Sequence, residues 1–334
     1  MKLSPSSKII ISRTDNIGDV VLTLPLACFL KKKYPRAEIS FLGKNYIKPL
    51  IDCCENIDRF IDWDALSSMP ERERTRAIKD IGAEVIIHVF PRPEIAKMAY
   101  KAGIPHRIGT SHRLYNWLYC NERVNFTRKN SLLHEAQLNF ELAKPLGIDV
   151  IPSLDEIGKS YGLTKLSALD EVWPKEIDKE KYNLIIHPLS RGSARNWDWK
   201  HYNKLIEILP SGKFKIFVTG TEAESAPIKE NILRHHPSVT DLTGKLNFTQ
   251  LIAFIANADG LVAASTGPLH IAAAMGKRAV GLYPSIRPMH PGRWAPLGPK
   301  ATYLSLDKEC SDCRNGGNCT CINTITAEQV KVLL

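Results

Sequence analysis

The feature that most constrains the fold is a pair of turns, one in each half of the chain, that join an apolar strand-like run to an apolar helix-like run. The first lies within Ser12–Pro25 and the second within Ala264–Lys277. Both turns hold small or polar residues, and the first N–H groups of a helix lack intrahelical partners at the positive end of the helix dipole. Such a turn suits an anion. Two of them predict two α/β domains that face each other across a cleft.

Short apolar strands alternate with helices in both halves, which predicts βαβ units and doubly wound parallel sheets with ligands at the carboxyl ends of the strands. The expected strands are 8–12, 38–42, 59–62, 84–90, 107–109, 183–187, 214–219, 241–243, 260–264 and, as the last one, 279–283. The expected helices are 20–33, 71–81, 134–146, 198–209, 222–235, 249–257, 268–275 and 326–334. Residues 150–181 read as a linker region.

We therefore predict an α/β architecture of two Rossmann-like domains. Residues 1–165 form the first domain, residues 166–322 the second, and residues 323–334 a terminal helix that can pack back on the first. A length of 334 residues fits two domains better than one core. No apolar stretch reaches the roughly 18–20 residues that span a bilayer, and no secretion signal is recognised, so we expect a cytoplasmic protein.

The formal net charge of +10 favours anionic partners. Residues 92–130 are especially basic and carry interleaved aromatic side chains. A solvated basic face is the usual meaning of such a run. The density of charge and the aromatic residues make a binding surface an equal alternative here.

In the first turn, Asp15 and Asp19 flank an Asn-Ile-Gly stretch. Asp19 can cap the following helix, which is a common role for aspartate. It can equally serve as a carboxylate at the ligand edge of the sheet that takes a proton from an attacking hydroxyl. Gly18 allows the backbone to turn sharply or to approach a ligand closely.

Three stretches of the second half are candidates for anion or nucleotide binding. Thr266 and Gly267 lie where a helix N-terminus meets a diphosphate, and His270 follows one turn later. The loop 187–197 supplies groups for phosphate oxygens, namely Ser190, Ser193 and Arg195. Glu224 either receives ribose hydroxyls or is simply an acidic residue in the first turn of a helix.

Four motifs occur in order along nearly the whole chain, from about Ile9 to Val330. They are R-x-D-x-I-G-D-V-V-L-T-L-P at residues 13–25, H-P at 187–188, R-x-W at 195–197 and T-G-P-x-H-x-A-A-A-x-G at 266–276. In these motifs the chain resembles glycosyltransferase family 9, the heptosyltransferase family of lipopolysaccharide core assembly. The resemblance implies a GT-B fold with an active site between two domains.

The resemblance also implies a metal-independent, inverting transfer from a nucleotide sugar, most often ADP-heptose, with no cofactor. Asp19 falls on the catalytic base of the family and Thr266-Gly267 on its diphosphate loop. Arg195 stands where heptosyltransferases carry a phosphate-binding lysine. Ser265 stands where many members have an aspartate that helps to place the donor sugar, which leaves the sugar open.

By the same analogy the first domain holds the acceptor and the second holds the donor. The residues expected at the acceptor are Arg13, Asp15, Gly18, Arg92, Arg107 and Arg113. The expected acceptor is a phosphorylated glycolipid of the lipopolysaccharide inner core. Contact with the inner face of the inner membrane would then be peripheral and electrostatic, and no nucleic-acid partner is expected.

Eight cysteines in a cytoplasmic chain do not imply disulfides. The clustered ones are Cys310, Cys313, Cys319 and Cys321. Four thiolates can hold zinc or an iron–sulfur cluster, but this spacing fits neither common ligand pattern well, so we expect no metal. A disulfide and free thiols remain alternatives for this tail.

Three other functions compete with a heptosyltransferase. The first is a transferase of the same family that uses another nucleotide sugar. The second is a nucleotide-sugar epimerase on the same two-domain fold. The third is a non-catalytic, basic nucleic-acid-binding protein, although no recognised nucleic-acid motif is present.

Overall fold

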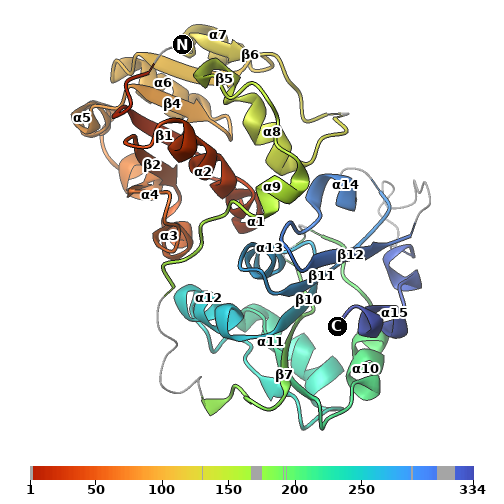
Figure 1. Cartoon of the computed structure of the whole chain (residues 1–334). Helices are drawn as coiled ribbons and strands as arrows, with labels where there is room; N and C mark the ends of the chain where they lie inside the picture. The colour runs from red at the N-terminus through yellow and green to blue at the C-terminus, as the bar shows by residue number, and fades with distance from the viewer. Residues whose placement is uncertain are drawn as a thin grey trace. The chain divides into compact units, whose positions relative to one another are not determined.

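The computed structural model describes residues 3–129, 131–166, 175–190, 192, 194–286, 289–306 and 320–334. The chain divides into two compact units, Met1–Lys165 and Leu166–Leu334. Each unit is built on one parallel sheet with helices on both faces (Figure 1). The predicted α/β class with two doubly wound parallel sheets is therefore confirmed.

The sheet of the first unit has the strand order β3-β2-β1-β4-β5-β6. Its strands are β1 (Lys8–Ser12), β2 (Glu38–Gly43), β3 (Arg59–Asp62), β4 (Val85–His88), β5 (His106–Thr110) and β6 (Glu122–Val124). The order reverses between β1 and β4, which pair in parallel with Ser12 opposite His88. In sheets of this type ligands bind at that reversal, outside the carboxyl ends of the strands.

The helices of the first unit are α1 (Ile17–Val21), α2 (Leu24–Lys33), α3 (Lys48–Asp52), α4 (Trp63–Ser68), α5 (Glu71–Ile81), α6 (Pro93–Lys101), α7 (Leu114–Tyr119), α8 (Glu135–Glu141) and α9 (Leu154–Gly158). Single 3₁₀ turns occupy Asn45–Ile47 and Lys144–Leu146. On one face of the sheet, Ile78 of α5 and Ile95 of α6 pack with Ile10 and Ile86 in a buried cluster. Burial of such side chains stabilises by roughly 1.5–3 kcal/mol each.

The sheet of the second unit has the order β12-β11-β10-β7-β8-β9. Its strands are β7 (Tyr182–His187), β8 (Phe214–Val218), β9 (Thr240–Asp241), β10 (Gly260–Ala264), β11 (Arg278–Tyr283) and β12 (Ala301–Ser305). The reversal falls between β7 and β10, so both units share one topology. Its helices are α10 (Trp199–Ile208), α11 (Glu222–Ile228), α12 (Phe248–Asn257), α13 (Gly267–Ala274), α14 (Pro291–Trp294) and α15 (Ala327–Val332), with a π-helical turn at Lys229–Leu233 and a 3₁₀ turn at Ile322–Thr324.

The terminal helix α15 belongs to the second unit, and the expectation that it packs back on the first stays a prediction. Ile325 and Val330 are buried in the same core cluster as Tyr202 and Leu205 of α10. The apolar side chains of the terminal segment thus complete the core of the second unit. Figure 1 shows α15 alongside α10.

Several elements differ from the sequence-based expectation. The helix expected over 20–33 is two helices, α1 and α2, because Pro25 in the first turn of α2 has no N–H for a preceding turn. The strand 279–283 is not the last, since β12 follows it at the sheet edge. Helices α6 and α7 and strand β6 were missed in the basic segment. Within the expected linker, α9 forms behind a capping box of Ser153 and Glu156.

Candidate functional site

The first unit brings the turn after β1 and the loop after β4 to the reversal point of its sheet. The Nε of Arg92, which follows β4, donates to Thr14 Oγ1 at 2.7 Å, so the two segments are joined directly. Helix α1 begins in the turn after β1. The residues predicted to be functional in residues 13–19 therefore lie where a parallel sheet of this topology places its ligand.

A buried arginine is the centre of this site. The side chain of Arg13 is 2% exposed, and its guanidinium contacts five other side chains. Nε donates to Asp15 Oδ1 at 2.8 Å. Nη2 donates to Asp15 Oδ2 at 3.0 Å, to Asp19 Oδ1 at 2.5 Å and to Glu135 Oε1 at 3.1 Å. Nη1 donates to Thr23 Oγ1 at 3.3 Å and to Asn139 Oδ1 at 3.1 Å. These bonds satisfy the planar fork in full. Arg13 therefore positions carboxylates, and its contact with the acceptor stays a prediction.

Asp19 is a partly buried carboxylate in the middle of α1, with its side chain 13% exposed. Burial raises its pKa to about 6, helped by the charges of Asp15 and Glu135 and opposed by Arg13. Its Oδ1 is held by Arg13, whereas among the described residues Oδ2 has one long contact, of 3.5 Å, with Asn16 Nδ2. One oxygen is thus fixed and the other is available to a hydroxyl.

The capping role considered for Asp19 is excluded by the helix boundaries. Helix α1 is preceded by Asn16 and helix α2 by Thr23 as their N-cap residues. The hydroxyl of Thr23 donates to the backbone carbonyl of Asp19 at 2.9 Å, which fixes the backbone at this point. Gly18 lies inside α1 with helical backbone angles, so a sharp turn is not the reason for a glycine here.

The other expected acceptor residues divide into two groups. Asp15 is held by Arg13 and accepts a 2.5 Å bond at its carbonyl from the Tyr46 hydroxyl. Arg92 lies at the reversal point, and Arg113 is exposed just after β5. Arg107 does not fit, because its guanidinium donates to the carbonyls of Ile104, Pro105 and Tyr119 at the amino-terminal end of β5. These bonds give Arg107 a structural role, and its contact with the acceptor stays a prediction.

Helix α8 contributes two buried side chains, and the segment before it a half-buried arginine, that the sequence did not predict. Glu135 and Asn139 are both fully buried and face Arg13. Arg128 donates from Nε to Glu135 Oε1 at 2.8 Å and from Nη2 to the Val89 carbonyl at 3.1 Å. The spacing of a Glu and an Asn four residues apart on an apolar helix was the available indication.

In the second unit, Thr266 ends the turn between β10 and α13. It is the N-cap residue of α13, but its side chain makes no capping bond. The residue is only 7% exposed, and Thr266 Oγ1 has no hydrogen-bond partner among the described residues. Buried hydroxyls are normally paired. An unpaired hydroxyl at the N-terminus of a helix is suited to a bound anion.

The neighbouring residues of this turn are compatible with that role. The Ser265 hydroxyl contacts the phenol of Tyr283, and His270 is 3% exposed inside α13. Pro268 takes a first-turn position of the helix, where a missing N–H costs nothing. His270 is therefore a buried residue of α13, one turn after the candidate anion site.

The loop after β7 comes to the same reversal point, since β7 and β10 pair directly. Ser190 closes the loop on itself, with Oγ 2.9 Å from the Ala194 carbonyl and 3.0 Å from Asn196 Oδ1. Arg195 is half-buried in this loop. Ser193 lies outside the described residues. Trp197 is buried, and its Nε1 donates to the Ile325 carbonyl at 3.0 Å, so it anchors the loop to the terminal segment.

Glu224 has a structural role in the first turn of α11. Its Oε2 accepts from the backbone N–H of Thr221 at 2.7 Å and from the Thr221 hydroxyl at 2.8 Å, which makes a capping box. The nearby imidazole of His187 is 3.0 Å from the hydroxyl of Thr219, and burial lowers its pKa to about 4, so it is neutral near pH 7. The structural alternative for Glu224 is thus observed, and contact with ribose stays a prediction.

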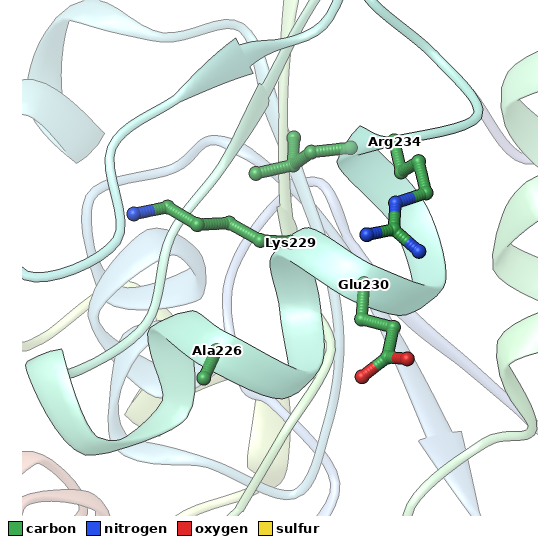
Figure 2. A pocket seen from close by; sticks show the side chains of 5 residues that line it. Ala226, Lys229, Glu230 and Arg234 are labelled. Atoms are coloured by element: carbon green, nitrogen blue, oxygen red, sulfur yellow. The ribbon is translucent and has the colours of Figure 1, made fainter.

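A surface hollow on the second unit lies away from these turns. Figure 2 shows Ala226, Lys229, Glu230 and Arg234 around it, at the end of α11 and along the π-helical turn. The hollow follows the second half of α11 and the π-helical turn after it. No predicted site residue lines it.

The cysteine tail is described only in part. Cys321 is buried in the core of the second unit beside Ile322, whereas Cys310, Cys313 and Cys319 lie outside the described residues. Within the described part of the chain, no group of three or more His, Cys, Asp or Glu side chains is placed to hold a metal. Over the same residues, no helix is both long and apolar enough to cross a bilayer.

The chain is similar to known proteins both in sequence and in fold. The chain is 27% identical over 307 residues to lipooligosaccharide heptosyltransferase 2 of Haemophilus influenzae, covering 87% of this chain and 86% of that protein. It is similar to the structure of Escherichia coli ADP-heptose lipopolysaccharide heptosyltransferase II, with a TM-score of 0.74, 18% identity, and 98% of this chain and 97% of that chain covered.

A more distant likeness is to the iron-containing dodecameric glycosyltransferase TibC of enterotoxigenic E. coli, with a TM-score of 0.56, 15% identity, and 100% of this chain and 76% of that chain covered. These structures share the GT-B fold. Residues 75–321 match the family model of glycosyltransferase family 9 (heptosyltransferase). The two reversal-point sites thus stand in a glycosyltransferase, and the chain belongs to glycosyltransferase family 9.

Proposed function

We propose that this enzyme transfers heptose from ADP-heptose to an inner-core acceptor of lipopolysaccharide, with inversion at the anomeric carbon and without a metal. The observation that carries the proposal is Asp19, a desolvated carboxylate with one oxygen fixed by Arg13 and the other open. Membership in the heptosyltransferase family and likeness to heptosyltransferases support the choice of sugar. Family membership also favours an enzyme over the nucleic-acid-binding alternative.

In this mechanism the first unit binds the acceptor and Asp19 is the general base. The acceptor hydroxyl bonds to Asp19 Oδ2, and its oxygen attacks the anomeric carbon of the donor. The C–O bond to the diphosphate breaks on the opposite face, and the hydroxyl proton passes to the carboxylate. General-base assistance of this kind contributes about 10²–10⁴-fold to rate.

The second unit is proposed to bind the nucleotide diphosphate. Negative charge grows on the leaving phosphate oxygens during transfer. The N–H groups at the start of α13, the hydroxyl of Thr266 and the guanidinium of Arg195 are suited to stabilise that charge. Together they offer an electrostatic alternative to a divalent cation at the leaving group.

The acceptor is proposed to be a phosphorylated, lipid-linked core glycan. Arg92 and the exposed Arg113 lie at the carboxyl edge of the first sheet and suit its phosphate groups. An acceptor of this kind is embedded in a membrane, so the enzyme would work in peripheral contact with the inner face of the inner membrane. The donor sugar is the least constrained part, because Ser265 replaces the family aspartate near the sugar.

The test is a transfer assay with purified enzyme, a delipidated inner-core acceptor and a panel of ADP-, GDP-, UDP- and dTDP-sugars. We expect product only with acceptor present, with ADP-heptose preferred, and with the opposite anomeric configuration to the donor. Full activity in EDTA and no stoichiometric iron or zinc are expected. Turnover of nucleotide sugar without acceptor would identify an epimerase instead, and loss of activity on metal removal would contradict the metal-free mechanism.

The pH profile provides an independent check on the base. Asp19 must be ionised to accept a proton, and its pKa is raised to about 6. We expect kcat/KM to fall about tenfold for each pH unit below about 6, because the protonated fraction then dominates. The measurement is kcat/KM for the acceptor from pH 5 to 8. A flat profile down to pH 5 would exclude Asp19 as the base.

Substitution of the buried hydroxyl tests the diphosphate site. Thr266→Val keeps the shape of the side chain and removes the unpaired Oγ1. We expect ADP to bind about tenfold more weakly, since a hydrogen bond to a charged group contributes roughly 1.5–3 kcal/mol. Isothermal titration with ADP measures this, and Thr302→Val on β12 is a matched control. Unchanged ADP affinity in Thr266→Val would place the diphosphate elsewhere.

A further inference from the structure

Helix α7 presents an apolar face to solvent at the β6 edge of the first sheet. Leu114, Trp117 and Leu118 are 89%, 59% and 72% exposed. Their spacing of three and four residues puts them on one side of the helix. Figure 1 shows α7 next to β5 and β6.

The rest of the helix is fixed, so these side chains cannot turn inward. Asn116, on the opposite side, is fully buried and donates from Nδ2 to the Thr110 carbonyl at 2.8 Å. The indole of Trp117 donates from Nε1 to the Ser111 carbonyl at 2.9 Å. The exposed face is therefore held in place by the fold.

This grouping is unlike the other exposed apolar side chains in the described part of the chain. Met69 and Tyr303 lie on separate segments, and Val150 precedes α9 and has one exposed apolar neighbour in sequence, Leu154. Single exposed apolar residues are normal on a protein surface. Three on one short helix form a contiguous patch, and such a patch marks an interaction surface.

The rim of the patch is basic. Arg113 precedes α7 and Arg123 follows it, and both are exposed. The guanidinium of Arg123 lies 4.7 Å from the centre of the Trp117 ring. No acidic residue occurs within α7, and the nearby Glu122 is 3.6 Å from the imidazole of His106. The patch thus combines leucine, tryptophan and arginine, the composition of a surface that lies in a bilayer interface.

We propose that this face, Leu114, Trp117 and Leu118 with Arg113 and Arg123, docks on an anionic lipid bilayer. The inference rests on the proposed function in one respect, because a lipid-linked acceptor explains why the enzyme would need such a surface. A protein partner fits less well, since a stable protein interface needs about 20–30 residues on each side and α7 offers a few. The cations match the charge of anionic headgroups, and the apolar side chains enter below them.

The test uses full-length protein and vesicles of phosphatidylglycerol or phosphatidylcholine, without donor or acceptor. We expect binding to phosphatidylglycerol vesicles that weakens with salt, and little binding to phosphatidylcholine. The variant L114S/L118S should lose at least about tenfold in vesicle affinity, because the apolar side chains supply the insertion. V332S is the matched control, since Val332 is 84% exposed on α15, and it should bind like the wild type.

A second readout does not depend on the leucine variants. Brominated phosphatidylglycerol should quench part of the tryptophan emission of the wild type, and that part should be missing in W117F. Equal vesicle binding by L114S/L118S and the wild type would overturn the proposal. So would a concentration-dependent dimer that the double substitution abolishes, because the face would then bind a second copy.

The experiments distinguish failure of the docking proposal from failure of the proposed transferase function. Transfer to the delipidated acceptor should be unchanged in L114S/L118S, since these side chains face away from the sheet. Loss of vesicle binding with normal transfer supports the docking surface. Absence of transfer in every variant, including the wild type, would count against the proposed function and leave the lipid result standing.

Discussion

Asp19→Asn should lose about 10²–10⁴-fold in kcat while ADP binds as in the wild type. The amide cannot take the proton of the acceptor hydroxyl, so the loss reflects general-base catalysis. Asn keeps the shape of the side chain and can still accept a bond from Arg13. Transfer kinetics and ADP titration on the same preparation measure both parts of this expectation.

The thermal stability of Asp19→Asn distinguishes a loss of catalysis from misfolding. The pKa of Asp19 is about 6 in the native protein against 3.8 for the free side chain. A carboxyl with a raised native pKa makes the native state less stable as pH rises from about 4 to 6, and the deficit persists above that range. Asp19→Asn removes the deficit, so at pH 8 it should unfold at the same or a higher temperature than the wild type.

A charge-matched substitution completes the experiment. Asp52→Asn removes one negative charge from the same unit, at a side chain that is 52% exposed on α3 and paired with Lys48. It should keep wild-type transfer rates. If both variants lose activity equally, general charge and not the base is responsible. Near wild-type turnover by Asp19→Asn would remove Asp19 from the mechanism.

Arg13→Met should destabilise the first unit by about 3–5 kcal/mol, the range for removing one member of a buried ion pair. Three carboxylates, Asp15, Asp19 and Glu135, meet at this guanidinium. Without it they repel one another in a site that water enters little. Urea unfolding at pH 8 measures the loss.

The pH dependence of Arg13→Met identifies the cause. Loss of the guanidinium raises the native pKa of Asp19 further above its unfolded value, so the variant gains stability relative to the wild type as pH falls. The deficit at pH 5 should be smaller than at pH 8. The double variant Arg13→Met/Glu135→Gln should recover part of the loss, because one of the repelling charges is gone. A deficit that is the same at both pH values would point to lost packing instead.

The fold could be predicted from the sequence where local pattern determines structure. Strand β1 is a run of three consecutive isoleucines, buried on both sides, and its position is unambiguous. Strand β12 was missed because it is a half-exposed edge strand with a weak apolar pattern, and Tyr303 in it is 46% exposed. Helix α7 was missed because its apolar residues face solvent, which inverts the pattern that identifies a helix in a core.

Only the site residues that lie within one short sequence motif could be predicted. Asp19 and the Thr266 turn lie within single motifs, and both came to the reversal point of a sheet. Glu135 was missed because it meets Arg13 across 122 positions of sequence, and no local pattern records that contact. The bonds of Arg107 to three carbonyls were not predictable, because an arginine that binds a phosphate and one that binds carbonyls look the same in a sequence.

The bond from Trp197 to the Ile325 carbonyl joins residues 128 positions apart, and the N–H of nearby Asp198 donates to Asn323 Oδ1 at 2.9 Å. During translation, the first unit has all its strands long before residues 320–334 leave the ribosome. The loop after β7 gains its support only after that final segment emerges. A ribosome that stalls before residue 320 therefore releases a chain whose first unit can fold but whose second unit is incomplete.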